Sequence, residues 1–156
     1  MKTLVLGMGN PILTDDGVGI YAAAEVAKRV QRDDLDVAEA SVGGMRLLSV
    51  IAGYGRVILV DAIQTPGGRP GDIVRLRADD TRCSMHAGCT HDLSLAGALA
   101  LGRGMGMALP DDEHLAIIAI EVEDVLTFGE TCTPAVAAAI PRAVEAVLAL
   151  LEEGTA

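Results

Sequence analysis

Short apolar runs alternate along this chain with segments whose apolar residues recur every three to four positions. Runs that are apolar on both faces are typical of buried strands, and the three-to-four spacing is typical of helices that cover them. The pattern predicts strands at residues 3–8, 36–40, 57–63, 72–77 and 115–120, helices at 17–30, 45–53 and 92–101, a surface loop at 102–106, and a long amphipathic helix after Thr133. Strands that alternate with helices predict an α/β layer architecture.

Two parts of this pattern lead to more specific expectations. Residues 72–77 follow residues 57–63 after a loop alone, which favours an antiparallel pair and therefore a mixed sheet. Thr133 and Pro134 are typical of an N-cap and a first helical position. Pro141 falls inside the helix that follows, so we expect a kink or a delayed helix start there.

Length and composition narrow the class of protein. The 156 residues suit a single domain over 1–156, and 51% hydrophobic residues exclude disorder as the main state. Twelve Lys and Arg against 22 Asp and Glu give a net charge of −10, which argues against nucleic acid or anionic membranes as partners. We find no apolar run long enough to span a bilayer and no signal peptide. The chain has three cysteines, an odd number. These features favour a cytoplasmic protein with reduced thiols.

Three polar residues fall at or near the ends of predicted strands, where α/β proteins gather their ligands. Asp16 follows the first strand, Asp61 lies near the end of the strand at 57–63, and His91 precedes the helix at 92–101. Two carboxylates and an imidazole could together bind a borderline divalent metal. A simpler interpretation also stands, in which Asp15 and Asp16 cap the helix at 17–30 and His91 is a cap or core residue.

Two weaker patterns point to other kinds of site. Gly7 and Gly9 resemble the start of a dinucleotide-binding fingerprint, although position 12 is Ile where the third glycine belongs. Cys83, His86 and Cys89 lie close to His91 and could hold a zinc or nickel ion of their own, although their spacing matches no standard zinc motif. The role of this Cys83/His86/Cys89 segment stays open.

The motifs taken together resemble the hydrogenase maturation endopeptidases. The segment at residues 4–19, LVLGMGNPILTDDGVG, is similar to the N-terminal signature of that family, and the resemblance covers nearly the whole chain. It continues through VGGM at 42–45, VDA at 60–62 and HDLSL at 91–95, and from Glu121 through Thr133-Pro134 to the end.

This resemblance implies a fold and an activity. The family fold is a three-layer α/β/α sandwich around a twisted, mostly parallel mixed sheet, here of about five strands. The family removes a C-terminal extension from the large-subunit precursor of a [NiFe] hydrogenase after nickel insertion. By resemblance, Asp16, Asp61 and His91 bind a metal, the nickel of the substrate, which cadmium or zinc could replace. The resemblance also suggests a monomer.

The chemistry of cleavage stays open at this level. The bound metal could polarise the scissile carbonyl or supply the attacking water, or Asp16 or Asp61 could act as a general base, as in an aspartic-type protease. No nucleophile motif of the Gly-x-Ser-x-Gly kind is present, and Ser94 is expected on a helix. Competing functions are a non-catalytic nickel-sensing or nickel-delivery module and a small nucleotide-binding protein.

Overall fold

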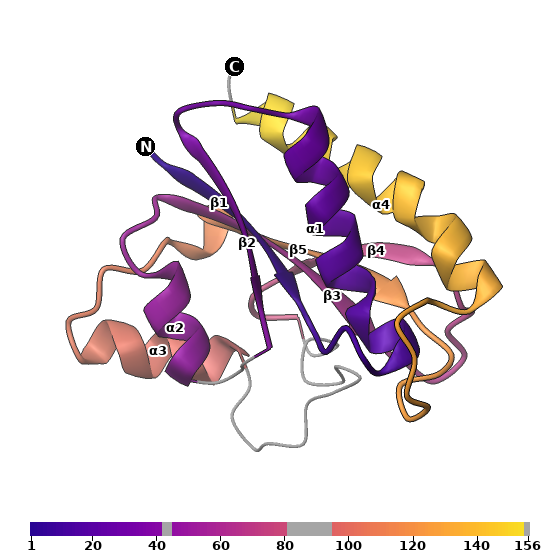
Figure 1. Ribbon diagram of the computed structural model, residues 1–156. Helices are drawn as coiled ribbons and strands as arrows, with labels where there is room; N and C mark the ends of the chain where they lie inside the picture. Colours follow the sequence, from indigo (N-terminus) through magenta and orange to yellow (C-terminus); the bar gives the residue numbers. More distant parts are fainter. Residues whose placement is uncertain (42–44, 81–94, 155–156) are drawn as a thin grey trace.

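The computed structural model describes residues 1–41, 45–80 and 95–154. Five strands form one sheet in the order β2-β1-β3-β5-β4, and helices cover both of its faces (Figure 1). The strands are β1 (Thr3–Met8), β2 (Leu35–Ala40), β3 (Arg56–Ile63), β4 (Ile73–Arg77) and β5 (Leu115–Glu121). The helices are α1 (Val18–Arg29), α2 (Met45–Ile51), α3 (Leu95–Gly104) and α4 (Pro134–Glu153), with short 3-10 turns η1 (Thr14–Gly17) and η3 (Asp112–His114).

Two apolar cores, one on each face of the sheet, explain the layers. On one face, side chains such as Val5 and Val60 pack with α1 and α4. On the other face, side chains such as Leu6 and Leu59 pack with α2 and α3. Neighbouring residues of β1 and β3 point to opposite faces of the sheet, and both faces are buried. The sequence of each strand is therefore a continuous apolar run. The expected α/β/α sandwich around a mixed five-stranded sheet is confirmed.

The expected pairing of the fourth strand is wrong. β4 runs antiparallel to its neighbour, but that neighbour is β5, because β1 and β5 occupy both edges of β3 as parallel partners. The segment after β3 passes the end of β5, where Gly71 N donates to the Glu121 carbonyl at 2.8 Å and Glu121 N donates to the Asp72 carbonyl at 2.8 Å. The chain therefore returns on the outer side of β5.

Glycines account for two differences between the predicted and the observed ends of helices. α2 ends two residues before Gly53, whose φ of +89° is a left-handed conformation that stops a helix. α3 runs through Gly104, so residues 102–104 are helical and not part of the predicted surface loop. A Cβ at Gly102 would lie 2.7 Å from a methyl carbon of Leu48, so the absence of a side chain lets α3 approach α2 closely. The predicted start of this helix at residue 92 lies outside the described residues.

The last helix runs without interruption from Pro134, so a delayed start at Pro141 is wrong. Both Pro141 and Ala137 are exposed, and water can reach the carbonyl that the missing Pro141 N–H would have bonded. Helix α4 is long and apolar enough to cross a membrane by length and composition alone, with 20 residues and an 18-residue stretch of mean hydropathy 1.7. One face of it, including Val136 and Val147, is packed in the core against the sheet.

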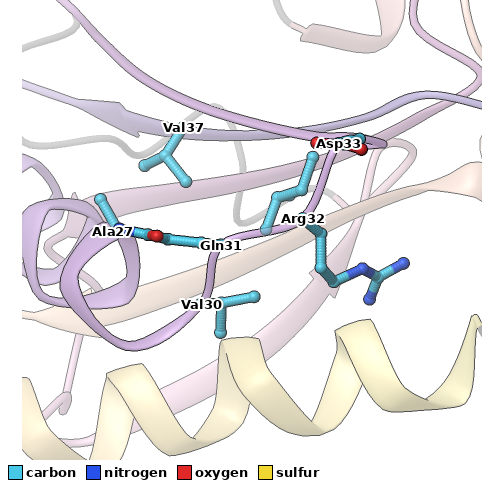
Figure 2. A pocket seen from close by; sticks show the side chains of 7 residues that line it. Ala27, Val30, Gln31, Arg32, Asp33 and Val37 are labelled. Carbon is cyan, nitrogen blue, oxygen red and sulfur yellow. The ribbon is translucent and has the colours of Figure 1, made fainter.

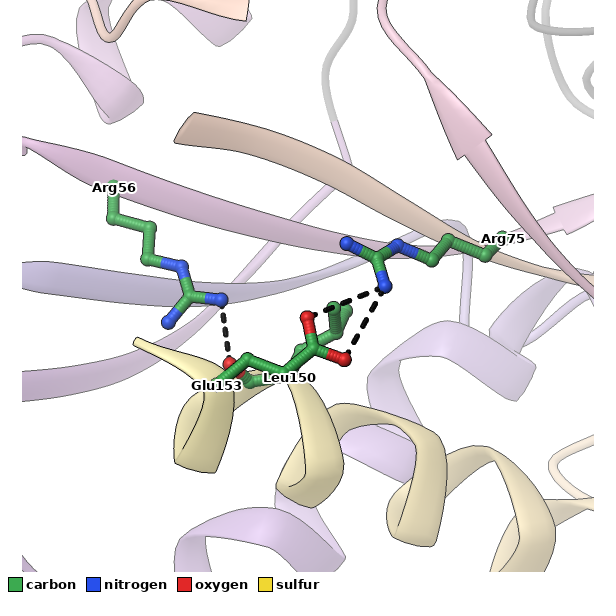
Figure 3. A network of polar contacts seen from close by, with 4 residues as sticks. All are labelled: Arg56, Arg75, Leu150 and Glu153. Atoms are coloured by element: carbon green, nitrogen blue, oxygen red, sulfur yellow. Dashed lines mark hydrogen bonds and ion pairs between the residues drawn. The ribbon is translucent and has the colours of Figure 1, made fainter. Parts of the chain in front are cut away.

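An arginine at the start of β3 caps the end of this helix. Arg56 donates from its guanidinium to the carbonyl of Leu150, in the last turns of α4 (Figure 3). Beside it, Arg75 of β4 approaches Glu153 at 3.4 Å. A Cβ at Gly154 would lie 1.9 Å from the Arg56 guanidinium, so the glycine after the helix leaves room for this contact.

Candidate active site

The turn between β1 and α1 places Asp16 at the carboxyl edge of the sheet. Gly9, with φ +134°, lets the chain fold back so closely that a Cβ there would lie 1.9 Å from the Asp16 carbonyl oxygen. The backbone N–H of Asn10 then donates to the Asp16 carboxylate at 3.0 Å. The Asp16 residue is 5% exposed. A short glycine-rich turn therefore buries this carboxylate and sets its orientation.

Asp61 lies near the carboxyl end of β3, the central strand of the sheet. It is 7% exposed, and the N–H of Ala62 donates to its carboxylate at 2.8 Å. Its side chain points to the same face of the sheet as those of Leu59 and Ile63, which pack in the core on the α2 and α3 side. A carboxylate at this point interrupts a run of buried apolar residues, and that arrangement is costly unless polar partners compensate for it.

The register of the sheet brings Asp16 and Asp61 to the same edge. Gly7 pairs with Val60, so Asp61 is level with Met8, where β1 ends and the turn carrying Asp16 begins. The 3-10 turn η1 packs against β3. The start of α1 also lies directly on this strand, because a Cβ at Gly19 would be 2.2 Å from the Val60 carbonyl oxygen. The two carboxylates predicted from sequence thus share one end of the β1–β3 pair.

The third predicted ligand, His91, lies outside the described residues, as do Cys83, His86, Cys89 and Ser94. Within 1–41, 45–80 and 95–154, no three His, Cys, Asp or Glu side chains are grouped as ligands for a metal ion. The ligand set of Asp16, Asp61 and His91 therefore stays a prediction.

Asp15 has a different role from the helix cap that the sequence suggested. Helix α1 begins at Val18 without a side-chain cap, and Asp15 is fully buried and turned toward the segment between β5 and α4. Its carboxylate accepts hydrogen bonds from the N–H groups of Glu123 and Asp124, both at 3.0 Å, and from the N–H of Thr133 at 2.7 Å. Thr133 occupies the predicted N-cap position, but its hydroxyl binds Asp15 instead of capping α4.

Sequence reasoning missed a fourth buried carboxylate, Glu121 at the end of β5. It is 4% exposed, and it accepts hydrogen bonds from the backbone N–H of Thr65, at 3.1 Å, and from the Thr65 hydroxyl. Gly68 sits against the same carboxylate. The available signal was an acidic residue at the end of a run of apolar residues, as at Asp61. The contacts show that Glu121 holds the turn that follows β3.

The two glycines that suggested nucleotide binding serve packing inside the protein. A Cβ at Gly7 would lie 2.5 Å from the Gly19 carbonyl oxygen and 2.8 Å from Ala23 of α1. The space beside Gly9 is filled by the carbonyl of Asp16. Other parts of the protein fill the space beside Gly7 and beside Gly9. Neither glycine therefore leaves room for a phosphate, and the structure does not support the dinucleotide-binding interpretation.

Two surface hollows lie away from the Asp16 and Asp61 carboxylates. One is lined by residues between the end of α1 and the start of β2, including Val30, Arg32 and Val37 (Figure 2). Arg32 is paired there with Asp34 at 2.6 Å. The other is lined by Arg103 and the acidic residues Asp111, Asp112 and Glu113, near the start of β5. Both hollows adjoin the amino ends of strands, opposite the edge where α/β sheets bind ligands.

Comparison with known proteins identifies the family. A model described as hydrogenase maturation protease matches residues 20–150. The chain belongs to the hydrogenase maturation protease family. It is therefore a hydrolase of the endopeptidase type, and the resemblance read from the sequence motifs is confirmed.

Relatives and solved structures of this family match almost the whole chain. The hydrogenase 2 maturation protease of Escherichia coli strain K12 is 31% identical over 155 residues, which cover 98% of this chain and 92% of that protein. Protein FrxA of Pyrococcus furiosus is 28% identical over 144 residues, covering 90% of this chain and 98% of that protein. The hydrogenase maturating endopeptidase HybD from E. coli superposes with a TM-score of 0.79 at 32% identity, covering 99% and 94% of the two chains. A hydrogenase 2 maturation peptidase from a Thaumarchaeota archaeon superposes with a TM-score of 0.70 at 25% identity, covering 97% and 98%.

Proposed function

We propose that this member of the hydrogenase maturation protease family removes the C-terminal extension of a nickel-loaded [NiFe] hydrogenase large-subunit precursor. The observation that carries the proposal is the pair of buried carboxylates, Asp16 and Asp61, at one edge of the sheet in a chain of this family. We further propose that the protein acts in the cytoplasm as a monomer.

We propose that Asp16, Asp61 and His91 recognise the nickel ion that the substrate carries. Carboxylate and imidazole ligands bind nickel less strongly than thiolates do. Such a site is suited to complete the coordination of a nickel ion that the substrate already holds. The site then discriminates loaded from unloaded precursor, because only the loaded form supplies the ion. The chemistry supports this reading, since buried carboxylates gain most from a cation that enters a site of low polarity.

Cleavage of the peptide bond needs an activated water and a polarised carbonyl. A carboxylate at Asp16 or Asp61 is suited to accept a proton from the water as general base. The nickel of the substrate, held by the same residues, would act as a Lewis acid near the scissile carbonyl. The two routes differ in the role of the metal: general-base catalysis uses a carboxylate to take the proton of the water, whereas the Lewis-acid route uses a divalent cation at the scissile carbonyl, which zinc can supply as well as nickel.

The decisive experiment incubates the full-length protein with purified precursor in nickel-loaded and nickel-free forms and detects the released C-terminal peptide by mass spectrometry. We expect release from the loaded form alone. Asp16→Asn, Asp61→Ala and His91→Ala should each abolish release while the protein stays folded, and Asp33→Asn, an exposed control, should release peptide normally. Normal processing by His91→Ala would refute the ligand assignment.

The same incubation separates the protease from its non-catalytic alternative. A nickel-sensing or nickel-delivery module would bind the loaded precursor and release no peptide. Cleavage by the unmodified chain excludes that alternative, and stable binding without any product would replace the protease proposal with it.

A further inference from the structure

Three exposed apolar side chains lie on two segments that pair beside Asp16: Ile12 on the turn between β1 and α1, and Leu126 and Phe128 on the loop between β5 and α4. Ile12 is 47% exposed, Leu126 is 86% exposed and Phe128 is 80% exposed. Phe128 is the only phenylalanine of the chain, which has no tryptophan. We call these three residues the apolar patch. A protein this poor in aromatic residues loses burial energy by leaving its one phenylalanine in water, and exposed patches of this kind mark interaction sites.

Backbone pairing holds the patch together across two distant segments. Leu13 and Gly129 form a parallel bridge, in which Gly129 N donates to the Ile12 carbonyl at 2.9 Å and Thr14 N donates to the Gly129 carbonyl at 2.9 Å. Because side chains alternate along paired extended segments, Ile12 and Phe128 lie on the same side of this bridge. The loop between β5 and α4 is seen beside the turn that leads into α1 (Figure 1).

The loop that carries Leu126 and Phe128 is anchored at several points. The Asp15 carboxylate binds its beginning and its end, through the contacts to Glu123, Asp124 and Thr133 described above. The hydroxyl of Thr14 donates to the Thr127 carbonyl at 2.5 Å, and Thr14 itself has a left-handed backbone with φ of 51°. A loop fixed in this way presents its apolar side chains with little ordering cost left for binding.

Acidic residues flank the patch on the same loop. Glu123 and Glu130 are both exposed, on either side of Leu126 and Phe128. The chain as a whole carries a net charge of −10. An apolar centre with an acidic rim is complementary to a segment that has apolar side chains next to basic ones.

We propose that the apolar patch binds an apolar, positively charged segment of the precursor polypeptide and so holds the scissile region over the Asp16 and Asp61 edge. The inference rests on the proposed function, because it takes the occupant to be the substrate of that site. The patch and the carboxylate are continuous in the chain, since Ile12 and Asp16 belong to the turn between β1 and α1. The patch determines affinity for the precursor and takes no part in breaking the peptide bond.

The test compares the unmodified protein with a Leu126→Ser/Phe128→Ser double variant and with Met105→Ser. Met105 is 65% exposed and lies between α3 and the start of β5, so it controls for the loss of an exposed apolar side chain elsewhere. Three quantities are measured: the KM and kcat for release of the C-terminal peptide from nickel-loaded precursor, the Kd for the same precursor at low and high salt, and the oligomeric state of each protein alone.

We expect the double variant to raise KM and Kd about tenfold with kcat near that of the unmodified protein, as removal of an aromatic anchor does. Met105→Ser should change none of these quantities, and the Kd of the unmodified protein should rise as salt increases.

Unchanged KM and Kd in the double variant would overturn the inference while leaving the protease proposal intact. A dimer of the unmodified protein that the double variant breaks would also overturn it, because the patch would then bind a second copy of this chain. If the unmodified protein releases no peptide, the protease proposal fails, and the Kd comparison alone decides whether the patch binds the precursor.

Discussion

The carboxylate of Asp15 accepts hydrogen bonds from both the backbone N–H and the hydroxyl of Thr133, at 2.7 and 2.8 Å, although the two residues are 118 positions apart. This contact fastens the start of α4 to the turn between β1 and α1. The same carboxylate binds the start of the loop that carries Phe128. One buried acid therefore holds together the two segments that border the candidate active site, and it does so beside Asp16.

We expect Asp15→Asn to lower the free energy of unfolding by about 3 kcal/mol, because an amide places a donor among N–H groups that all need an acceptor. Urea denaturation followed by circular dichroism measures the change. Asp33→Asn, at an exposed position, provides the control and should stay within about 0.5 kcal/mol of the unmodified protein. Equal midpoints for the two variants would show that the Asp15 contacts contribute nothing to stability.

Gly19→Ala should destabilise the protein by about 3 kcal/mol even though alanine favours helices, because the new methyl group would overlap the Val60 and Met8 carbonyl oxygens. The matched control is Gly104→Ala at the end of α3, where, among the described residues, no atom beyond the adjacent residues and the helix's own backbone lies within 4 Å of the added carbon. That control should be neutral or slightly stabilising. Thermal melting of both variants checks the pair, and a Gly19→Ala melting temperature at or above that of Gly104→Ala would contradict the close approach of α1 to β3.

Two neighbouring arginines at the end of α4 should differ in their effect on stability. Arg56→Ala removes the donor to the Leu150 carbonyl and should cost about 1.5 kcal/mol. Arg75→Ala removes an exposed pair with Glu153 and should cost no more than about 0.5 kcal/mol. Urea denaturation of the two variants in parallel measures the difference. The capping role of Arg56 would be wrong if both cost the same.

Burial, followed by the nearby charge of Asp15, raises the pKa of the Cys132 thiol from an ordinary 9.0 to about 11. The reactive thiolate is therefore scarce at pH 8, and we expect Cys132 to be alkylated by iodoacetamide about a hundredfold more slowly than in the urea-unfolded chain. The rate should keep rising with pH up to about 11. Peptide mapping by mass spectrometry follows the modification of this residue alone. A native rate at pH 8 equal to the unfolded rate would show that the thiol is not shielded.

The local sequence pattern was enough to predict most strands and helices, and the motifs were enough to predict the family. The apolar run at Thr3–Met8 forms a strand with the predicted bounds, and the strand at 57–63 is extended by one residue to Arg56. These predictions succeed because a buried strand and an amphipathic helix each require a local repeat of apolar side chains, which is written in consecutive residues. The positions of Asp16 and Asp61 at strand ends were equally visible, because the carboxyl edge of a parallel sheet follows from the order of the elements.

Which segments come into contact became clear only from the folded chain. The fold placed β5 between β3 and β4, turned Asp15 away from α1 toward Thr133, and set Phe128 beside Ile12 through the Leu13–Gly129 bridge. Each of these contacts joins segments that are far apart in the chain. The local pattern of apolar residues does not indicate that they meet. The free energies of these contacts depend on the competition of all strands and buried polar groups for partners, and that competition is settled when the whole chain packs.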